Sequence, residues 1–370
     1  GDQAAEMTPD GFTFYGGVSH GVEKRSKVRS RIVADQLVKL IKEADHVVIM
    51  GHRMSDLDAI GAAEGVLRIC KICDVPAVIA VRRDATLAAS LIDALCKAGQ
   101  KDDFIDPKDA LPIISKRTLC IVVDTYQAGL VESKDILEKC GKVAVIDHHR
   151  KGVGYIENPA LVCHEPYSSS ASELVTELLQ YVGERDDKPN RVEAEGLLAG
   201  ILLDTQDFTL HTGVRTFEAA AALRRYGAET ERVRRLFDVT MVEYNAKADL
   251  VEKAQMYKNC AISIGGEVAP EARVAIAQAA NDLLRIQGVD ASFVAVQVGN
   301  GVNVSARSMG AVNVQVIMES LGGGGHQTMA AAQLKHITPQ AARSRIQDAI
   351  DQYYLSQKKT TPEARPAKGE

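Results

Sequence analysis

An apolar run ends in one acid and two imidazoles at Val143-Ala144-Val145-Ile146-Asp147-His148-His149. Other short, β-rich apolar runs precede it at residues 46–50, 77–81 and 119–123, and helix-compatible stretches separate them. Buried strands that alternate with helices are typical of a largely parallel sheet flanked by helices. We therefore expect an α/β fold whose sheet contains these runs.

The pattern changes twice further along the chain. After Ser168 it is almost entirely helical, at residues 172–182, 191–203, 216–226 and 242–257. From Cys260 a second α/β pattern begins, with strand-like runs at 261–264, 292–298 and 302–306 and helix-like stretches at 270–285, 312–321 and 339–354. We expect a linker at 1–30, a metal-binding catalytic domain at 31–240, a connecting helix at 241–260, a smaller C-terminal α/β domain at 261–357 and a disordered tail at 358–370.

The composition limits what the chain can bind. Its 370 residues carry a formal net charge of −5, contain no Trp and are only 5% aromatic. They give no overall attraction for nucleic acid and few rings on which successive bases could stack. No apolar run approaches the roughly 18 residues that cross a bilayer, and scattered cysteines without a secretory signal indicate reduced, cytosolic thiols. We expect a small anionic ligand, no long nucleic acid and no membrane contact.

Candidate metal ligands follow the apolar runs, at the sheet edge where open α/β sheets bind ligands. They are His52, Asp56, Asp58, Asp124, Asp147, His148, His149 and, after a helical run, Asp204. Imidazoles mixed with several carboxylates suit Mn²⁺ and similar ions, and the set is too rich in oxygen for a structural zinc site. Singly, each Asp could cap a helix and each His could be a core group, but together they favour a metal centre.

The number of acids fits two neighbouring cations. Two divalent ions a few ångströms apart need one shared carboxylate and separate ligands on either side. Asp124, after the middle strand, can supply the shared carboxylate. Four Asp side chains also offset the four positive charges of two such ions.

A second group of residues, in the C-terminal part, is suited to phosphate. It comprises Ser305-Ala306-Arg307-Ser308 and Gly322-Gly323-Gly324-Gly325-His326. Consecutive glycines let backbone N–H groups converge on an anion, and an Arg can hold phosphate through two parallel hydrogen bonds. A glycine run alone is equally compatible with a flexible turn. The candidate metal centre favours the phosphate interpretation.

These motifs resemble the DHH phosphoesterases that have a DHH-associated C-terminal domain. The general marks are Asp147-His148-His149, the loop at 52–58, Asp124, Asp204 and the glycines before His326. Within that family the chain is similar to the GdpP type of cyclic-di-AMP phosphodiesterases, through Phe14-Tyr15-Gly16-Gly17 and the runs 169–179, 305–308 and 312–319. The resemblance extends from about residue 14 to 354 and implies a two-domain DHH phosphoesterase.

The resemblance also implies a role for each residue of the motifs. His52, Asp56 and Asp124 would hold one Mn²⁺, and Asp58, Asp124, His148 and Asp204 would hold a second. Asp147 would orient its neighbours without touching metal. Asp124 and His149 would be catalytic, and the substrate contacts would be His149, Arg307, Ser308, Gly323, Gly324, Gly325 and His326.

The implied reaction is hydrolysis of cyclic-di-AMP to linear 5′-pApA by water that two Mn²⁺ activate. Two alternatives stay open: a nanoRNase or phosphatase acting on short linear nucleotides such as pApA and pAp, and a sensor that binds a cyclic dinucleotide without cleaving it. A RecJ-like exonuclease is disfavoured by the acidic balance. The sequence does not decide between adenine and guanine.

The resemblance also implies an oligomeric state and a cellular location. It implies a homodimer located in the cytoplasm, or at the cytoplasmic face of the membrane for a full-length GdpP-type protein. Residues 1–30 would then contain the end of a degenerate GGDEF domain.

Overall fold

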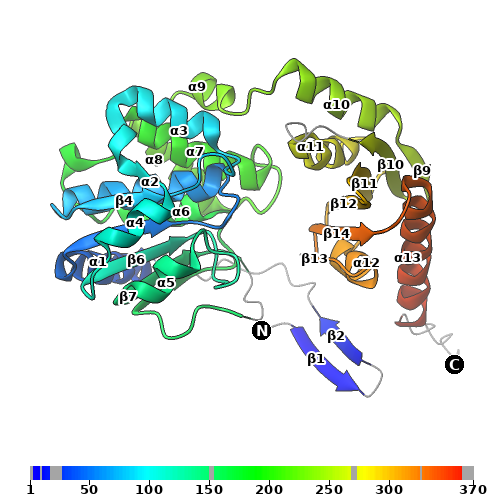
Figure 1. The fold of residues 1–370 in the computed structure, drawn as a ribbon, viewed down its shortest axis with the longest axis horizontal. Helices are drawn as coiled ribbons and strands as arrows, with labels where there is room; N and C mark the ends of the chain where they lie inside the picture. The colour runs from blue at the N-terminus through cyan, green and yellow to red at the C-terminus, as the bar shows by residue number, and fades with distance from the viewer. Residues whose placement is uncertain are drawn as a thin grey trace, which may run out of the picture. The chain divides into compact units, whose positions relative to one another are not determined.

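The structure, a computed structural model, describes residues 3–8, 11–16, 27–149, 154–267, 273–325 and 327–360. The chain divides into two units, Gly1–Asp238 and Val239–Glu370 (Figure 1). His326, parts of the expected linker and most of the expected tail lie outside the described residues. Within the described ranges, no helix has both the length and the apolar character that spanning a membrane requires.

The first unit contains a six-stranded parallel sheet. Its strands lie in the order β5 (Phe104–Ile105), β4 (Ala77–Ala80), β3 (His46–Met50), β6 (Thr118–Val123), β7 (Lys142–Asp147) and β8 (Leu161–His164), and every neighbouring pair is parallel. The α/β prediction is confirmed, and β3, β4, β6 and β7 match the expected runs to within about a residue at each end. The edge strands β5 and β8 were not among the expected runs, and β5 has only two residues, too few to show a readable pattern.

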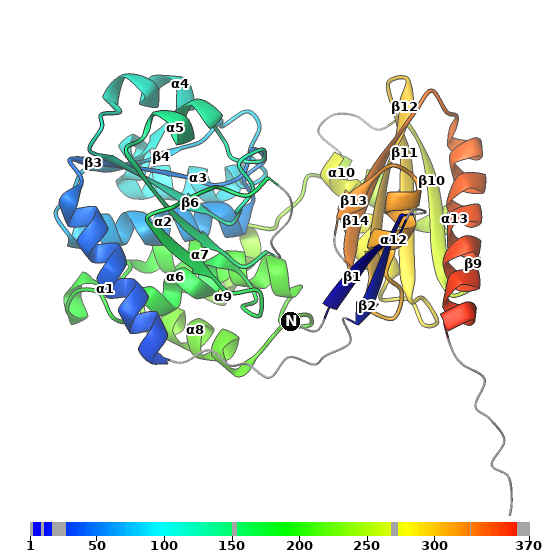
Figure 2. The ribbon, with the colours of Figure 1, turned by 90° about the horizontal axis from the view of Figure 1, so that it is seen from below.

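Helices cover both faces of this sheet (Figure 1, Figure 2). Alternate side chains of a strand point to opposite faces, so Val47 and Ile49 of β3 belong to the larger core, and Val48 and Met50 belong to the smaller one. The larger core also contains side chains from α1 (Lys27–Glu43), α2 (Leu57–Ile72), α3 (Ala89–Leu95), α6 (Ala171–Leu179), α7 (Arg191–Thr205), α8 (Val214–Arg225) and α9 (Thr230–Arg235). The smaller core contains side chains from α4 (Pro107–Ala110) and α5 (Lys134–Lys139).

The strand order reverses between β3 and β6. From β3 the chain continues to β4 and β5 on one side, and from β6 to β7 and β8 on the other. The ends of the central strands are nearly level, because Met50 pairs with Val122 and Val123 pairs with Ile146. Ligands of open α/β sheets bind at such a reversal, beyond the carboxyl ends of the strands. The loops after β3, β6 and β7 therefore meet at the expected site.

Two helices of the first unit touch through glycines. A β-carbon on Gly61 of α2 would lie 2.5 Å from the carbonyl oxygen of Gly196 on α7. One turn further along α7, a β-carbon on Gly200 would lie 2.8 Å from the Cα atom of Asp58. Close backbone approach requires glycine here. The crossing places the carboxyl end of α7, with Asp204, beside the amino end of α2.

The second unit is built on a mixed six-stranded sheet (Figure 2). Its strands lie in the order β13 (Gly324–Gly325), β14 (Met329–Lys335), β12 (Gly301–Ser308), β11 (Ala291–Val298), β10 (Cys260–Glu267) and β9 (Gln255–Tyr257), with β10 and β11 parallel and the other pairs antiparallel. One face packs on α12 (Val314–Ser320) and α13 (Pro339–Thr360), and the other packs on α10 (Met241–Glu252) and α11 (Arg273–Leu283). This confirms the expected second, smaller sheet domain.

Two expected elements need correction at their ends, and one range contains strands that were not expected. The helix expected at 242–257 is wrong at its end: α10 stops at Glu252, and β9 pairs with β10 across a tight turn in which Lys258 has a left-handed φ of +53°. The disordered tail was expected to begin at residue 358, but α13 continues to Thr360. The helix therefore includes the first residues of that range. The range expected as a linker contains an antiparallel pair, β1 (Gln3–Thr8) and β2 (Gly11–Gly16).

Candidate metal centre

The loop between β3 and α2 fixes His52 and Asp56. Asp56 caps α2: its Oδ1 accepts hydrogen bonds from the backbone N–H groups of Asp58 and Ala59 at 3.0 and 3.1 Å. Such caps hold a side chain in one orientation. His52 pairs with Val131 in an isolated β-bridge, and its Nε2 lies 3.8 Å from Asp56 Oδ1. Both side chains are partly exposed at the sheet edge.

Asp124 follows β6 directly and occupies the middle of the centre. Its backbone is left-handed, with a φ of +58°, and its N–H donates to the carbonyl oxygen of Ile146 at 2.9 Å. A non-glycine residue pays about 1–3 kcal/mol for such a conformation, which often marks a functional site. Its carboxylate is only 3% exposed, and Oδ2 lies 3.4 Å from His52 Nε2 while Oδ1 lies 3.4 Å from His148 Nε2. One carboxylate therefore faces two imidazoles.

His148 gathers a second set of acids. Its Nε2 lies 3.1 Å from Asp204 Oδ2, at the end of α7, and 3.9 Å from Asp58 Oδ2, at the start of α2. Asp58 is fully buried. Among the described residues, the buried atoms His148 Nε2 and Asp124 Oδ1 have no hydrogen-bond partner of good geometry. Buried polar atoms nearly always have one, so this arrangement fits a cation between them.

His149 is held differently from His148. Its Nδ1 lies 2.9 Å from Asp147 Oδ1, and its backbone N–H donates to the same oxygen at 3.2 Å. Asp147 is fully buried at the end of β7. The ring is therefore fixed with Nε2 directed away from Asp147, while Nδ1 also lies 3.6 Å from Asp124 Oδ1.

Three groups of donor atoms come within 4.8 Å of one another: His52, Asp56 and Asp124; Asp58, His148 and Asp204; and Asp124, His148 and His149. We call His52 with Asp56 the outer set and Asp58 with His148 and Asp204 the inner set, since Asp58 is fully buried. Asp124 lies between the two sets. The structure thus brings together every residue expected to bind metal, from the loops after β3, β6 and β7 and from α2 and α7.

The electrostatics of the centre favour cations. Burial would raise the pKa of Asp124, but the imidazoles of His148 and His52 outweigh it and hold that pKa well below its usual range. Burial would lower the pKa of His52, but Asp124 and Asp56 outweigh it and raise the pKa to about 11. Burial, with the charge of Asp124, raises the pKa of Asp58 well above its usual range. The carboxylates of the centre therefore favour a positive charge beside them, which either a protonated imidazole or a metal ion can supply.

Arg307, in the second unit, is a partly buried cation. It lies on β12 opposite Ser292 of β11 and Met329 of β14. Its Nη1 donates to Ser305 Oγ at 3.0 Å and to the Ala306 carbonyl at 2.9 Å, and burial lowers its pKa to about 10. No carboxylate in the described part of the chain forms an ion pair with it. Such a guanidinium is suited to an anionic ligand.

Ser308, next on β12, has a different setting. Its side chain is buried, and its Oγ accepts hydrogen bonds from the N–H groups of Gly310 and Val312 at 3.0 and 3.4 Å. The hydroxyl is thus already engaged in the turn after β12. The O–H of this hydroxyl is not used by either bond, so it can still donate to an anionic ligand.

The glycines expected to bind phosphate differ among themselves. A β-carbon on Gly325, whose φ is +147°, would lie 2.5 Å from the Cα atom of Ala330, and one on Gly323 would collide with the carbonyl oxygen of Ala331. The pairing of β13 with β14 therefore requires glycine at both positions. Gly324 is different, because a β-carbon there would meet no atom within 4 Å.

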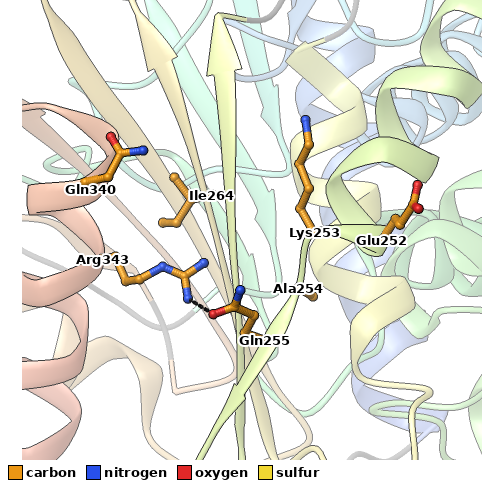
Figure 3. Close-up of a pocket in the computed structure, with 7 residues that line it drawn as sticks. All are labelled: Glu252, Lys253, Ala254, Gln255, Ile264, Gln340 and Arg343. Atoms are coloured by element: carbon orange, nitrogen blue, oxygen red, sulfur yellow. Dashed lines mark hydrogen bonds between the residues drawn. The ribbon is translucent and has the colours of Figure 1, made fainter.

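A pocket of about 300 Å³ lies elsewhere in the second unit (Figure 3). It is lined by Glu252, Lys253, Ala254, Gln255, Ile264, Gln340 and Arg343. Arg343 donates from Nη1 to Gln255 Oε1 at 2.7 Å. None of the expected site residues lines this pocket.

Two further groups at the centre could not be named from the sequence. The backbone N–H groups of Ala171 and Ser172 bind the carboxylate of Asp58, and Gly200 leaves room for it. Residues 169–179 stood out in the sequence, but no spacing connects them with a residue more than a hundred positions earlier.

Comparisons with known proteins agree with this architecture. Residues 46–201 match the DHH family, N-terminal domain, and residues 269–355 match the DHHA1 domain. The cyclic-di-AMP phosphodiesterase GdpP of Geobacillus thermodenitrificans is 45% identical over 360 residues, and that of Bacillus subtilis is 43% identical over 364. Each alignment covers 96% of this chain and 55% of the relative, so the chain spans about half the length of these curated relatives.

A solved structure has the same fold. The crystal structure of an exopolyphosphatase-related protein from Bacteroides fragilis superposes with a TM-score of 0.75 and 19% identity. The match covers 91% of this chain and all of that one.

Proposed function

The chain belongs to the DHH family and carries a DHHA1 domain, and from this premise we propose that it hydrolyses cyclic-di-AMP to linear 5′-pApA. The observation that carries the proposal is the buried carboxylate of Asp124, which directs one oxygen toward His52 and the other toward His148. Identities of 43–45% to GdpP phosphodiesterases along 96% of the chain support the choice of substrate.

We propose two Mn²⁺ per chain as cofactors. His52, Asp56 and Asp124 would hold one, and Asp58, Asp124, His148 and Asp204 would hold the other. The mixture of imidazole and carboxylate donors suits Mn²⁺ better than softer ions, and the buried Asp124 and His148 atoms without partners fit a cation. When bound, such ions lower the pKa of water and neutralise charge that develops on phosphorus.

The remaining residues would position the substrate. Asp147 holds the His149 ring, so His149 would present Nε2 to the phosphate that is cleaved. Arg307 would bind a second phosphate of the cyclic dinucleotide through charge-assisted hydrogen bonds, and the backbone at Gly324 would approach the ligand closely. We propose Asp124 and His149 as the catalytic residues, with Gly323, Gly325, Ser308 and His326 shaping the substrate site.

The same proposal extends to the domains, the cellular location and the oligomeric state of the protein. A catalytic domain at 31–240 and a substrate-binding domain at 261–357 would each correspond to one sheet. The cysteines form no disulfide, which supports a reducing, cytoplasmic location. We further propose a homodimer and no binding of long nucleic acid.

A product assay tests this function. The full chain is supplied with Mn²⁺ and, in parallel, cyclic-di-AMP, cyclic-di-GMP or pApA, and the products are separated by chromatography. We expect cyclic-di-AMP to be turned over fastest, with pApA accumulating. Equal or faster turnover of pApA would replace the proposal by a nanoRNase activity, and binding of cyclic-di-AMP without any product would replace it by a sensor.

A further inference from the structure

The carboxylate of Asp58 is held from outside its own helix. Ala171 N–H donates to Oδ2 at 2.7 Å and Ser172 N–H donates to Oδ1 at 2.8 Å. Both N–H groups belong to the first turn of α6, whose cap is Ser170. The first N–H groups of a helix have no partner within it, so α6 begins by binding an acid that α2 supplies.

This contact fixes the direction of the Asp58 carboxylate. Each carboxylate oxygen has two lone pairs, and the two amides occupy one on each oxygen. The opposite side faces the inner set, where His148 Nε2 lies 3.9 Å from Oδ2. Ser172 Oγ also donates to the Asp58 backbone carbonyl at 3.3 Å, which ties the start of α2 to the start of α6.

Gly200 of α7 packs directly against the contact between Asp58 and α6. A β-carbon at position 200 would lie 2.7 Å from Asp58 Oδ1 and closer still to Ser172 Oγ. A real β-carbon essentially never approaches that closely, so a side chain here must displace the Ser172 hydroxyl, the Asp58 carboxylate or the start of α2, where the Asp58 Cα atom would lie at 2.8 Å. Gly196, one turn earlier on the same helix, is different, because the three atoms nearest to a β-carbon there all belong to the side chain of Leu91, the closest at 3.0 Å.

We propose that the first turn of α6 and Gly200 act together as a positioning element for the inner metal position. They hold Asp58 so that its remaining lone pairs meet a cation shared with His148 and Asp204. In the outer set, Asp56 is held by the backbone N–H groups of Asp58 and Ala59 and His52 pairs with Val131, so neither side chain is bound directly by the amides of α6. This inference rests on the metal centre of the proposed function.

Manganese binding by the full chain tests the inference without using activity. Equilibrium dialysis with metal analysis is carried out on the wild type, Gly200→Ala and Gly196→Ala. We expect two Mn²⁺ in the wild type and in Gly196→Ala. Gly200→Ala should keep one Mn²⁺ at wild-type affinity and bind the second about 10–100-fold more weakly, as is typical when a group that orients a ligand is lost.

A second pair of variants removes a hydrogen bond without adding bulk at position 200. Ser172→Pro deletes the N–H that binds Asp58, and proline is tolerated in the first turn of a helix. Ser172→Ala keeps that N–H and is its control. Weaker binding of the second Mn²⁺ in Ser172→Pro alone supports the proposal, even where Gly200→Ala fails to fold.

The outcomes separate this inference from the proposed function. Two Mn²⁺ at wild-type affinity in both Gly200→Ala and Ser172→Pro would overturn the positioning element and leave the metal centre standing. Recovery of the second Mn²⁺ in a Gly200→Ala/Ser172→Ala double variant would also overturn it. Removing the collision between the new β-carbon and the Ser172 hydroxyl would then be enough to restore metal binding. A wild type that binds no Mn²⁺ would overturn the metal centre itself.

Discussion

At the scale of single residues, the centre depends on Asp124 more than on any other acid. Its left-handed backbone and buried carboxylate place one oxygen toward each of the two sets of ligands. His149 lies as near in sequence to His148 but is bound by Asp147. Neighbouring residues of one motif therefore have different surroundings.

Asp124→Ala should reduce both metal content and turnover. Because the carboxylate faces both sets, we expect loss of both Mn²⁺ and a fall in kcat of more than about 100-fold. His149→Ala is the matched comparison and should keep both ions while kcat falls about 100-fold or more. Metal analysis and steady-state kinetics measure both effects. Two Mn²⁺ in Asp124→Ala would disprove the bridging role, and metal loss in His149→Ala would mean that the roles of the two histidines are exchanged.

Arg307→Ala should weaken substrate binding and leave the metals in place. A hydrogen bond to a charged partner contributes about 1.5–3 kcal/mol, or roughly 10–100-fold in affinity. Arg343→Ala is a suitable control, because Arg343 lies in the same unit and lines the other pocket (Figure 3). Calorimetric titration with cyclic-di-AMP distinguishes them. A loss of affinity in Arg343→Ala only would move the ligand to that pocket.

At the scale of helices and strands, the sequence predicts the strands that are continuous apolar runs. It does not predict very short strands or contacts between residues that are far apart in the chain. The runs at β3, β4, β6 and β7 are readable because strands buried on both faces are apolar throughout. β5 and β13 have two residues each, and β9 forms only through a turn at Lys258 that no periodicity reveals. Most of the candidate ligands were predictable because they follow strands, and Asp204 because it ends an apolar helix, whereas the amides of α6 reach Asp58 only through helix packing.

Gly324→Ala tests whether the glycine-rich segment binds the ligand. The added β-carbon has open space, so the variant should fold like the wild type, and a loss of cyclic-di-AMP affinity of about 10-fold or more would come from obstruction of the ligand. Gly266→Ala, at another open position in the same unit, should bind normally. Wild-type affinity in Gly324→Ala would make the segment an ordinary turn, with glycine required only for the pairing of β13 and β14.

The contact between α2 and α7 also contains a buried acid that the metal centre does not use. Glu64 of α2 is fully buried and accepts a hydrogen bond from Gln100, while Glu193 of α7 pairs with Arg68. Burial, with the nearby charge of Glu193, raises the pKa of Glu64 from 4.5 to about 8. The folded state therefore binds this proton more tightly than the unfolded state.

Glu64→Gln should flatten the pH dependence of stability. Proton binding by Glu64 contributes fully to the free energy of unfolding below about pH 4.5. This contribution is lost as the pH rises through about 8, at up to about 1.4 kcal/mol per pH unit. The variant stays neutral, so its free energy of unfolding should exceed that of the wild type by a few kcal/mol at pH 9 and differ less at pH 5. Urea unfolding with chelator at both pH values measures this. The exposed Glu138→Gln is the control, and a parallel pH profile for Glu64→Gln and the wild type would contradict the argument.

At the scale of the whole molecule, the expected metal ligands all lie in the first unit, and Arg307 and the glycine-rich segment lie in the second. The proposed function therefore assigns the chemistry and the recognition of substrate to separate sheets. The net charge of −5 gives no overall attraction for an anion, so under that proposal the attraction would come from local groups, namely bound cations and Arg307.

Manganese should therefore stabilise the first unit selectively. Without metal, folding must gather Asp58, Asp124 and Asp204 within one buried centre, and a cation that binds only the folded state adds RT ln(1 + [L]/Kd), about 2.7 kcal/mol when the ion is at 100 times its Kd. Hydrogen exchange measured by mass spectrometry, with Mn²⁺ or chelator, should show slower exchange in peptides from β6 and β7 and no change in those from β11 and β12. Ca²⁺ should protect less, since it prefers six to eight oxygen ligands. Equal protection of both sheets, or equal protection of β6 and β7 in Asp124→Ala, would show that the ion is not bound at the centre between the outer and inner sets.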